Sequence, residues 1–203
     1  MSRDSIIKKA NLCIDEVYPE NNNYQDMDLF NVGEYLDQAA RIIVKIVPIR
    51  ALGPGVDLKE EDIDITIHDD GACEVTLPST FERLISVQAH DWAYPLTMAF
   101  DGDSPKYQQQ YNRVLRGTKH RPIAFLVNGG EKLVLYSTEK PTGTNDAIKE
   151  FRGFMFESVD DNYPTRLHDI TAWKTAELVL SAMNDVPAAQ ICQAKTQEIL
   201  ESL

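Results

Sequence analysis

The stretch DIDITIHDDGACEVTL, residues 62–77, is where the hydrophobic period of the chain changes from that of a helix to that of a strand. Isoleucines at positions 63, 65 and 67 alternate with polar residues, which places them on one face of a strand. Asp70-Gly71 is a typical turn pair, and the alternation then resumes at Cys73, Val75 and Leu77. The stretch therefore predicts a β-hairpin with one buried face.

Strand patterns recur downstream of this hairpin, over residues 84–89, 123–127, 133–136 and 151–156. The second and third of them flank Asn128-Gly129-Gly130, which signals another hairpin, and turns this short join antiparallel neighbours. Two short helical turns are expected between the strands. One follows from the capping-box spacing of Ser79 and Glu82, and the other from Ser104-Pro105.

Helical periodicity governs the N-terminal segment. A first apolar stripe, ending before Pro19, consists of Ile6, Ala10, Cys13 and Val17. A second helix, which Asp28 can cap, has a broad apolar face from Leu29 to Val47 and is expected to stop at Gly53-Pro54-Gly55.

The C-terminal segment is helical as well. It opens after Pro164-Thr165 with an apolar stripe on which Trp173 should be buried, and Asn184-Asp185 breaks it before a last helix. Packing the terminal helices together gives an α+β fold, in which a helical bundle (1–56 and 164–203) carries an inserted antiparallel β-rich lobe (57–163) within one domain.

Composition narrows the classes of function. The 203 residues are 43% hydrophobic, enough for a real core, and the net charge of -12 argues against a freestanding nucleic-acid binder. An acidic surface would equally suit a channel wall along which DNA slides without sticking. Cys13, Cys73 and Cys192 follow no ligand spacing and are expected to be reduced core residues. We see no apolar run that would anchor or export the chain.

No catalytic, cofactor or metal motif is recognisable, so no such residue is expected. His68-Asp69-Asp70 fits a solvated turn, and His168-Asp169 fits the first turn of a helix. The loop Thr142-Gly143-Thr144-Asn145 lacks the lysine and the context of a phosphate-binding loop.

Two other classes of function stay open. One is a small cytoplasmic enzyme, a hydrolase or transferase, that uses His90, Asp91 and His120, although nothing in the sequence orients them as base and partner. The other is a monomeric protein-binding module.

One basic stretch breaks the acidic pattern of the chain. It contains Arg113, Arg116, Lys119, His120 and Arg121 around Gly117. Basic side chains in a loop suit docking on an acidic partner. We therefore take Arg113, Arg116, Lys119 and Arg121 as candidate partner contacts, with solvated surface as the alternative.

Several segments resemble ring and adaptor proteins of podovirus-type tailed phages. These segments are LPSTFERLISV (77–87), Trp92, PLT (95–97), SPKY (104–107), RGT (116–118) and LHDITAWKTAELVL (167–180). The likeness covers roughly residues 62–203 and is greatest to head-to-tail ring proteins of the Bacteroides-infecting crAss-like phages.

The resemblance implies a structural virion protein without enzymatic activity, assembled in the host cytoplasm. It implies a cyclic homo-oligomer, twelvefold, whose helical bundles pack side by side below the portal protein. The ring would contact the portal protein and the next ring protein of the tail. Its bore would pass double-stranded DNA, and no membrane would be involved.

Overall fold

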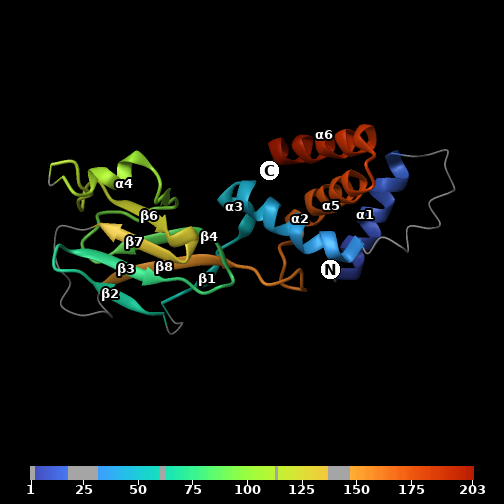
Figure 1. The fold of residues 1–203 in the computed structure, drawn as a ribbon. Coiled ribbons are helices and arrows are strands. Elements are labelled where there is room, and N and C mark those ends of the chain that lie inside the picture. Colours follow the sequence, from blue (N-terminus) through green and yellow to red (C-terminus); the bar gives the residue numbers. More distant parts are fainter. Residues whose placement is uncertain (1–2, 18–31, 60–62, 113, 137–146) are drawn as a thin grey trace. The chain divides into compact units, whose positions relative to one another are not determined.

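The structure, a computed structural model, describes residues 3–17, 32–59, 63–112, 114–136 and 147–203. The chain forms two units, one made of residues 1–53 with 156–203 and the other of residues 54–155. The first unit is helical and the second is built on β-sheets (Figure 1). This arrangement confirms the predicted fold class, an α+β fold in which helices from both ends of the chain pack together and the middle is β-rich.

The helical unit is organised around α5 (His168–Ala182), which contacts α1 (Arg3–Val17), α2 (Val32–Ile46) and α6 (Val186–Ser202). A short α3 (Ile49–Leu52) follows α2, and the 3-10 turn η3 (Thr165–Leu167) leads into α5. Most of the apolar positions predicted for α1 and α2 are buried, whereas the stripes predicted for α5 and α6 are buried only in part. On α1, for example, Ile6, Ala10 and Cys13 are buried, together with Ile14.

The second predicted helix is shorter than expected, because α2 ends at Ile46 and not at Gly53. Pro48 cannot donate the backbone hydrogen bond that would continue the helix. It stands at the N-cap of α3, whose C-cap residue Gly53 has a φ of 80°. The predicted cap Asp28 and the first apolar position, Leu29, lie outside the described residues.

The prediction that Trp173 is buried was wrong, because its side chain is only partly buried on α5. The positions of α5 that face neighbouring helices include the small residues Thr171, Ala172, Thr175 and Ala176, all of them buried. Small side chains let three helices approach α5 closely, and a tryptophan fits only at the margin of such a contact.

The β unit contains two sheets. The first has the order β1-β8-β4 and is antiparallel, with β1 (Val56–Asp57), β8 (Ile148–Met155) and β4 (Phe81–Ala89). The second has the order β2-β3-β7-β6-β5, with β2 (Ile65–Ile67), β3 (Ala72–Thr76), β7 (Lys132–Tyr136), β6 (Ile123–Val127) and β5 (Phe100–Asp101). All pairs in the second sheet are antiparallel except β5 and β6, which are parallel.

Both predicted hairpins form. Ile65 lies opposite Val75 in the β2–β3 pair, and Ile123 lies opposite Tyr136 in the β6–β7 pair. The helical turn predicted from Ser79 and Glu82 does not form, because Glu82 lies inside β4. A turn closed by the Phe81 amide and the Pro78 carbonyl leads directly into this strand, whose apolar run pairs with β8.

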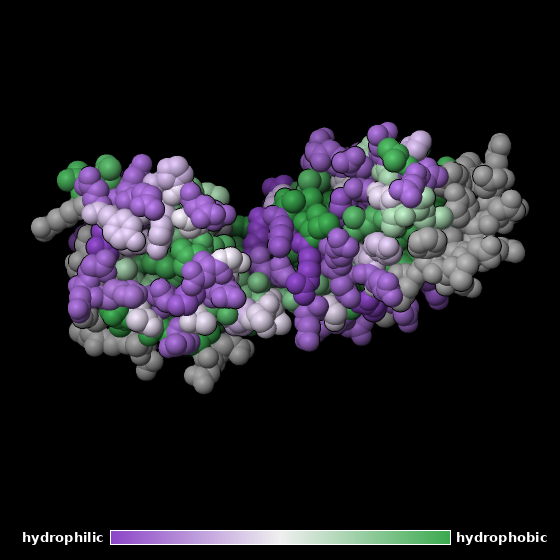
Figure 2. Space-filling model, in the orientation of Figure 1, coloured by the Kyte–Doolittle hydropathy of each residue, from purple (hydrophilic) through white to green (hydrophobic). Residues whose placement is uncertain are grey.

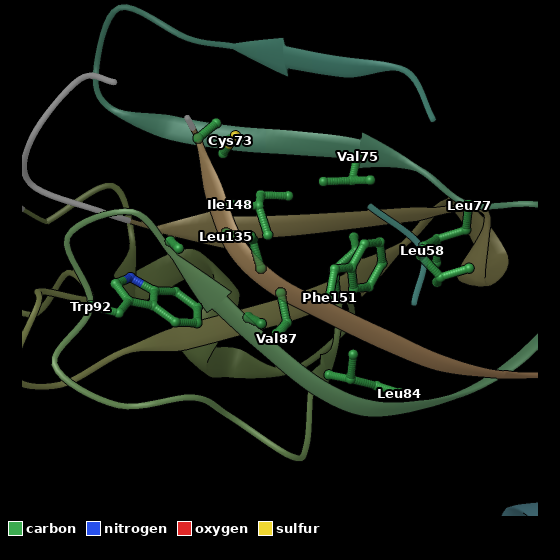
Figure 3. Close-up of a cluster of buried hydrophobic side chains, with 14 residues drawn as sticks. Leu58, Cys73, Val75, Leu77, Leu84, Val87, Trp92, Leu135, Ile148 and Phe151 are labelled. Carbon is green, nitrogen blue, oxygen red and sulfur yellow. The ribbon is translucent and has the colours of Figure 1, made fainter. Parts of the chain in front are cut away.

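The core of the β unit lies between the two sheets (Figure 3). Val75 and Leu135 contribute from one sheet, and Val87 and Phe151 from the other. Trp92, whose place the sequence left undecided, is a core residue that donates its indole N–H to the Tyr136 carbonyl oxygen at 3.0 Å. Aromatic and branched side chains thus fix the two sheets against each other.

Residues 156–163, which we predicted as part of the β-rich lobe, belong to the helical unit. The Phe156 and Tyr163 rings lie 6.0 Å apart, and the Arg41 guanidinium lies 5.6 Å from the Phe156 ring. The Val159 amide donates to Asp37 on α2 at 2.9 Å. These contacts explain why the segment after β8 packs with the helices.

Candidate protein-interaction site

The basic stretch follows α4 (Pro105–Gln109), the short helix that Ser104 caps as predicted by accepting a hydrogen bond from the Lys106 amide. The chain then forms a loop from Gln110 to Gly117, which we call the 110–117 loop and which the structure describes except at residue 113. The buried Gln110 side chain closes it by accepting a hydrogen bond from the Gly117 amide at 2.8 Å. Its amide nitrogen donates to the Lys106 carbonyl oxygen at 2.9 Å.

Gly117 is required by a close approach of the backbone to the five-stranded sheet. A Cβ atom at this position would lie 2.3 Å from the Ile123 Cγ2 atom and 3.3 Å from the Tyr136 Cβ atom. A larger residue fits only if the Ile123 side chain or its strand shifts. The loop is therefore fixed to the sheet at the end where Ile123 pairs with Tyr136.

Arg116 strengthens this attachment. Its Nη2 atom lies 3.0 Å from the Asp70 Oδ2 atom in the β2–β3 turn, a charge contact without hydrogen-bond geometry, and its guanidinium stands 5.0 Å from the centre of the Tyr136 ring. Burial raises the pKa of Tyr136, and the charge of Arg116 acts in the opposite direction. With its side chain only 17% exposed, Arg116 is held against its own sheet.

Lys119 and Arg121 are exposed and lie in a turn closed by reciprocal backbone hydrogen bonds between Thr118 and Arg121. The Arg121 Nη2 atom donates to the Val114 carbonyl oxygen at 3.4 Å, so its charge stands beside the 110–117 loop. Of the four candidate contacts, the structure thus places Lys119 and Arg121 on the surface and turns Arg116 inward. Arg113 lies outside the described residues.

Three strongly exposed apolar side chains of the β unit lie together on the same loop, a feature that the sequence reasoning missed. Val114 is 78% exposed, Tyr111 77% and Leu115 51%. We call these three residues the apolar tip. Hydrophobic surface is visible on the loop after α4 in Figure 2. The signal in the sequence is an apolar pair that fits neither a helical nor an alternating pattern.

A groove of about 780 Å³ lies at the turn end of the β6–β7 hairpin, opposite the end to which the 110–117 loop is attached. We call it the Asp101 groove. Its apolar walls are Ala99, Tyr107, Leu126 and Val127, and its polar lining includes Glu74, Asp101, Asp103 and the turn 128–130. The Asp101 carboxylate accepts a hydrogen bond from the Asp103 amide at 3.2 Å, which shapes the bend between β5 and α4.

The charges around the Asp101 groove are partly compensated. Lys132 is paired with Glu74 at 2.5 Å, and His68 lies 3.9 Å from the same carboxylate. Lys106 lies 3.9 Å from the centre of the Phe100 ring. In the described parts of the chain, Asp101 and Asp103 form no ion pair, so they give the groove its negative charge.

His90 and Asp91, candidates for an enzymatic role, lie at the end of β4. The Asp91 side chain is 4% exposed and its Oδ1 atom is 3.8 Å from the His90 Nδ1 atom, while neither carboxylate oxygen has a hydrogen bond among the residues described. His120 is exposed and accepts a hydrogen bond from the Tyr94 hydroxyl through its carbonyl oxygen. Within the residues that the structure describes, it contacts neither His90 nor Asp91 by a hydrogen bond or ion pair.

The remaining residues that the sequence analysis considered as possible site residues lie in turns and helix ends where they have contacts within the fold. His168 begins α5 as predicted, and its buried ring stacks on Tyr163 with centroids 6.0 Å apart. The His68 backbone carbonyl oxygen accepts a hydrogen bond from the Gly71 amide in the β2–β3 turn. The loop 142–145 lies outside the described residues. Across the described ranges, no three His, Cys, Asp or Glu side chains could together hold a metal ion.

All three cysteines are buried, as expected, and none of them forms a disulfide bond within the described residues. Burial raises the pKa of the Cys13 thiol to about 11 and that of Cys192 to about 12, so these thiols resist ionisation and are poor nucleophiles.

Among the described helices, none is long and apolar enough to cross a membrane.

The sequence was compared with protein-family models and with curated proteins. No protein-family model matches the chain, and no curated protein matches it either.

Proposed function

We propose that this chain is a structural subunit that assembles with copies of itself into a cyclic ring in the head-to-tail connector of a tailed phage. In this role the ring sits below the portal protein, joins the capsid to the tail and lets double-stranded DNA pass. The virion location, the portal protein and the next tail ring as partners, and the absence of a catalytic step all belong to this proposal.

The observation that carries the self-assembly part is the apolar tip. Three large apolar side chains, Tyr111, Val114 and Leu115, are each more than half exposed within five positions of the chain. Burying one such side chain stabilises a complex by roughly 1.5–3 kcal/mol. A concentration of this kind on an exposed loop is typical of a contact with another protein.

The attachment of the loop supports the same conclusion. Gln110 joins the two ends of the loop, and Arg116 and Gly117 hold the second end against the sheet. A loop that is already fixed loses little conformational entropy when it binds, so its apolar side chains contribute more fully to affinity. A loop used only as a connection needs neither the anchors nor the exposed side chains.

The segments that resemble phage ring proteins enclose this loop. Residues 104–107 form the cap and start of α4, and residues 116–118 contain the anchors Arg116 and Gly117. The resembling segment 167–180 forms most of α5, the central helix of the helical unit. The net charge of -12 fits a bore that must not bind DNA, because like charges repel.

The test is to measure the mass of the purified chain by light scattering after size-exclusion chromatography, over a wide range of concentration, and to image the particles in negative stain. We expect a single oligomer that appears as closed rings. A monomeric mass at every concentration would instead favour the monomeric binding module. Rings that join to a purified portal protein would support the connector role.

A further inference from the structure

We propose that the apolar tip of one copy docks in the Asp101 groove of the next copy, so that the β units join head to tail. This inference rests on the proposed ring function and assigns the two surfaces that form its subunit contact. Both surfaces lie on the β unit and consist of described residues.

Both surfaces contain apolar side chains, although the exposed lining of the groove is more polar than apolar. Val114 and Leu115 project from the tip, and Leu126 and Val127 line the groove beside Ala99 and Tyr107. At about 780 Å³ the groove falls within the range of roughly 300–1,000 Å³ that protein pockets use for ligands larger than a single side chain. It can therefore receive more than one residue of the tip.

The two surfaces also match in charge. Lys119 and Arg121 lie exposed beside the tip, and Arg121 is joined to it through the Val114 carbonyl oxygen. Asp101 and Asp103 lie exposed at the groove. Since the chain as a whole is acidic, two copies repel each other except where such a basic surface meets an acidic one.

The positions of the two surfaces make the contact directional. The tip is attached where Ile123 pairs with Tyr136, and the groove lies where Val127 pairs with Lys132 and the turn begins. Four residue steps along a strand separate these ends by about 13 Å. Different patches thus meet across each contact, and such heterologous contacts give rings when the rotation between copies closes.

The test uses two variants, each of which removes one side of the contact. Val114→Asp with Leu115→Asp places charge on the tip, and Asp101→Asn with Asp103→Lys reverses the charge of the groove. Asn at position 101 keeps the oxygen that accepts the Asp103 amide. All four positions are exposed, and circular dichroism melts should show an unchanged fold.

We expect each variant alone to stay monomeric at concentrations where the parent is assembled, with self-association weakened at least ~100-fold. Mixing the two variants in equal amounts leaves one intact tip and one intact groove. Light scattering should then detect a heterodimer that grows no further. Leu12→Asp, on an exposed apolar residue of the helical unit, is the matched control and should assemble like the parent.

The outcomes separate this inference from the proposed function. If the parent assembles and the tip variant assembles equally well, or if only Leu12→Asp dissociates the oligomer, the inference is overturned and the ring function stands. If the groove variant assembles normally while the tip variant does not, the tip binds another surface and the inference fails. A monomeric parent overturns both. Should the groove variant melt early, Asp103→Lys alone replaces it, because the Asp103 carboxylate makes no hydrogen bond among the described residues.

Discussion

Arg116 and Asp70 form an ion pair, with 3.0 Å between Nη2 and Oδ2, that ties the 110–117 loop to the β2–β3 turn. The same guanidinium lies over the Tyr136 ring. Arg116, which the sequence marked as a candidate partner contact, therefore packs within its own unit, and in our proposal Lys119 and Arg121 make the contact. The consequences can be tested by substitution.

Replacing Arg116 with Ala removes the ion pair and the contact with Tyr136 together. We expect a loss of about 1–3 kcal/mol in the free energy of unfolding, because a partly desolvated cation–π contact adds to a half-exposed ion pair. Urea denaturation followed by tryptophan fluorescence measures the change. Arg121→Ala, which removes an exposed guanidinium from the same stretch, should stay within about 0.5 kcal/mol of the parent. Equal losses in both variants would contradict the structural role of Arg116.

Reversing the two exposed charges, Lys119→Glu with Arg121→Glu, should slow self-association and leave the fold intact. Charges at the rim of a contact act mainly on the rate of encounter, so we expect a fall of about tenfold at low salt. The difference from the parent should shrink at 1 M salt, where the Debye length is only about 3 Å. Stopped-flow light scattering measures the rate. An unchanged rate at low salt would mean that these side chains are merely solvated.

Gly117→Ala tests the close approach of the loop to the sheet. The added Cβ would meet the Ile123 side chain at 2.3 Å, so we expect a destabilisation of about 1–3 kcal/mol from overpacking. Repeating the substitution in an Ile123→Ala background should reduce this loss, because the clashing methyl group is gone. A loss of the same size in both backgrounds would place the strain elsewhere.

Asp91→Asn tests whether the buried carboxylate near His90 is a structural cost. Neither oxygen of Asp91 has a hydrogen bond, and burying an unsatisfied charged group is unfavourable. We expect the variant to be more stable by about 1–2 kcal/mol, measured by thermal and urea unfolding. Asp161→Asn, at an exposed position, is the matched control and should change little. A less stable Asp91→Asn would show that the carboxylate has a favourable partner.

Much of the local structure was predictable from the sequence. The alternation around Asp70-Gly71 and the turn at Asn128-Gly129-Gly130 predicted two hairpins with the pairing that the structure shows. The apolar stripe of α2 and the cap at Ser104 were predictable for the same reason. Hydrophobic periodicity, turn residues and helix-capping residues reflect local conformational preferences of the backbone, and in these segments the local preferences agree with the fold.

The sequence by itself determined that the chain has helical segments at both ends and a β-rich middle, because a hydrophobic period shows which face of each element must be buried. Only the tertiary structure decided what covers each face. It placed Trp173 at the margin of its helix contact and Trp92 in the core, and it joined residues 156–163 to the helices. It also turned Arg116 inward and left Val114 exposed. Such outcomes depend on contacts between residues far apart in the chain, which no local period encodes.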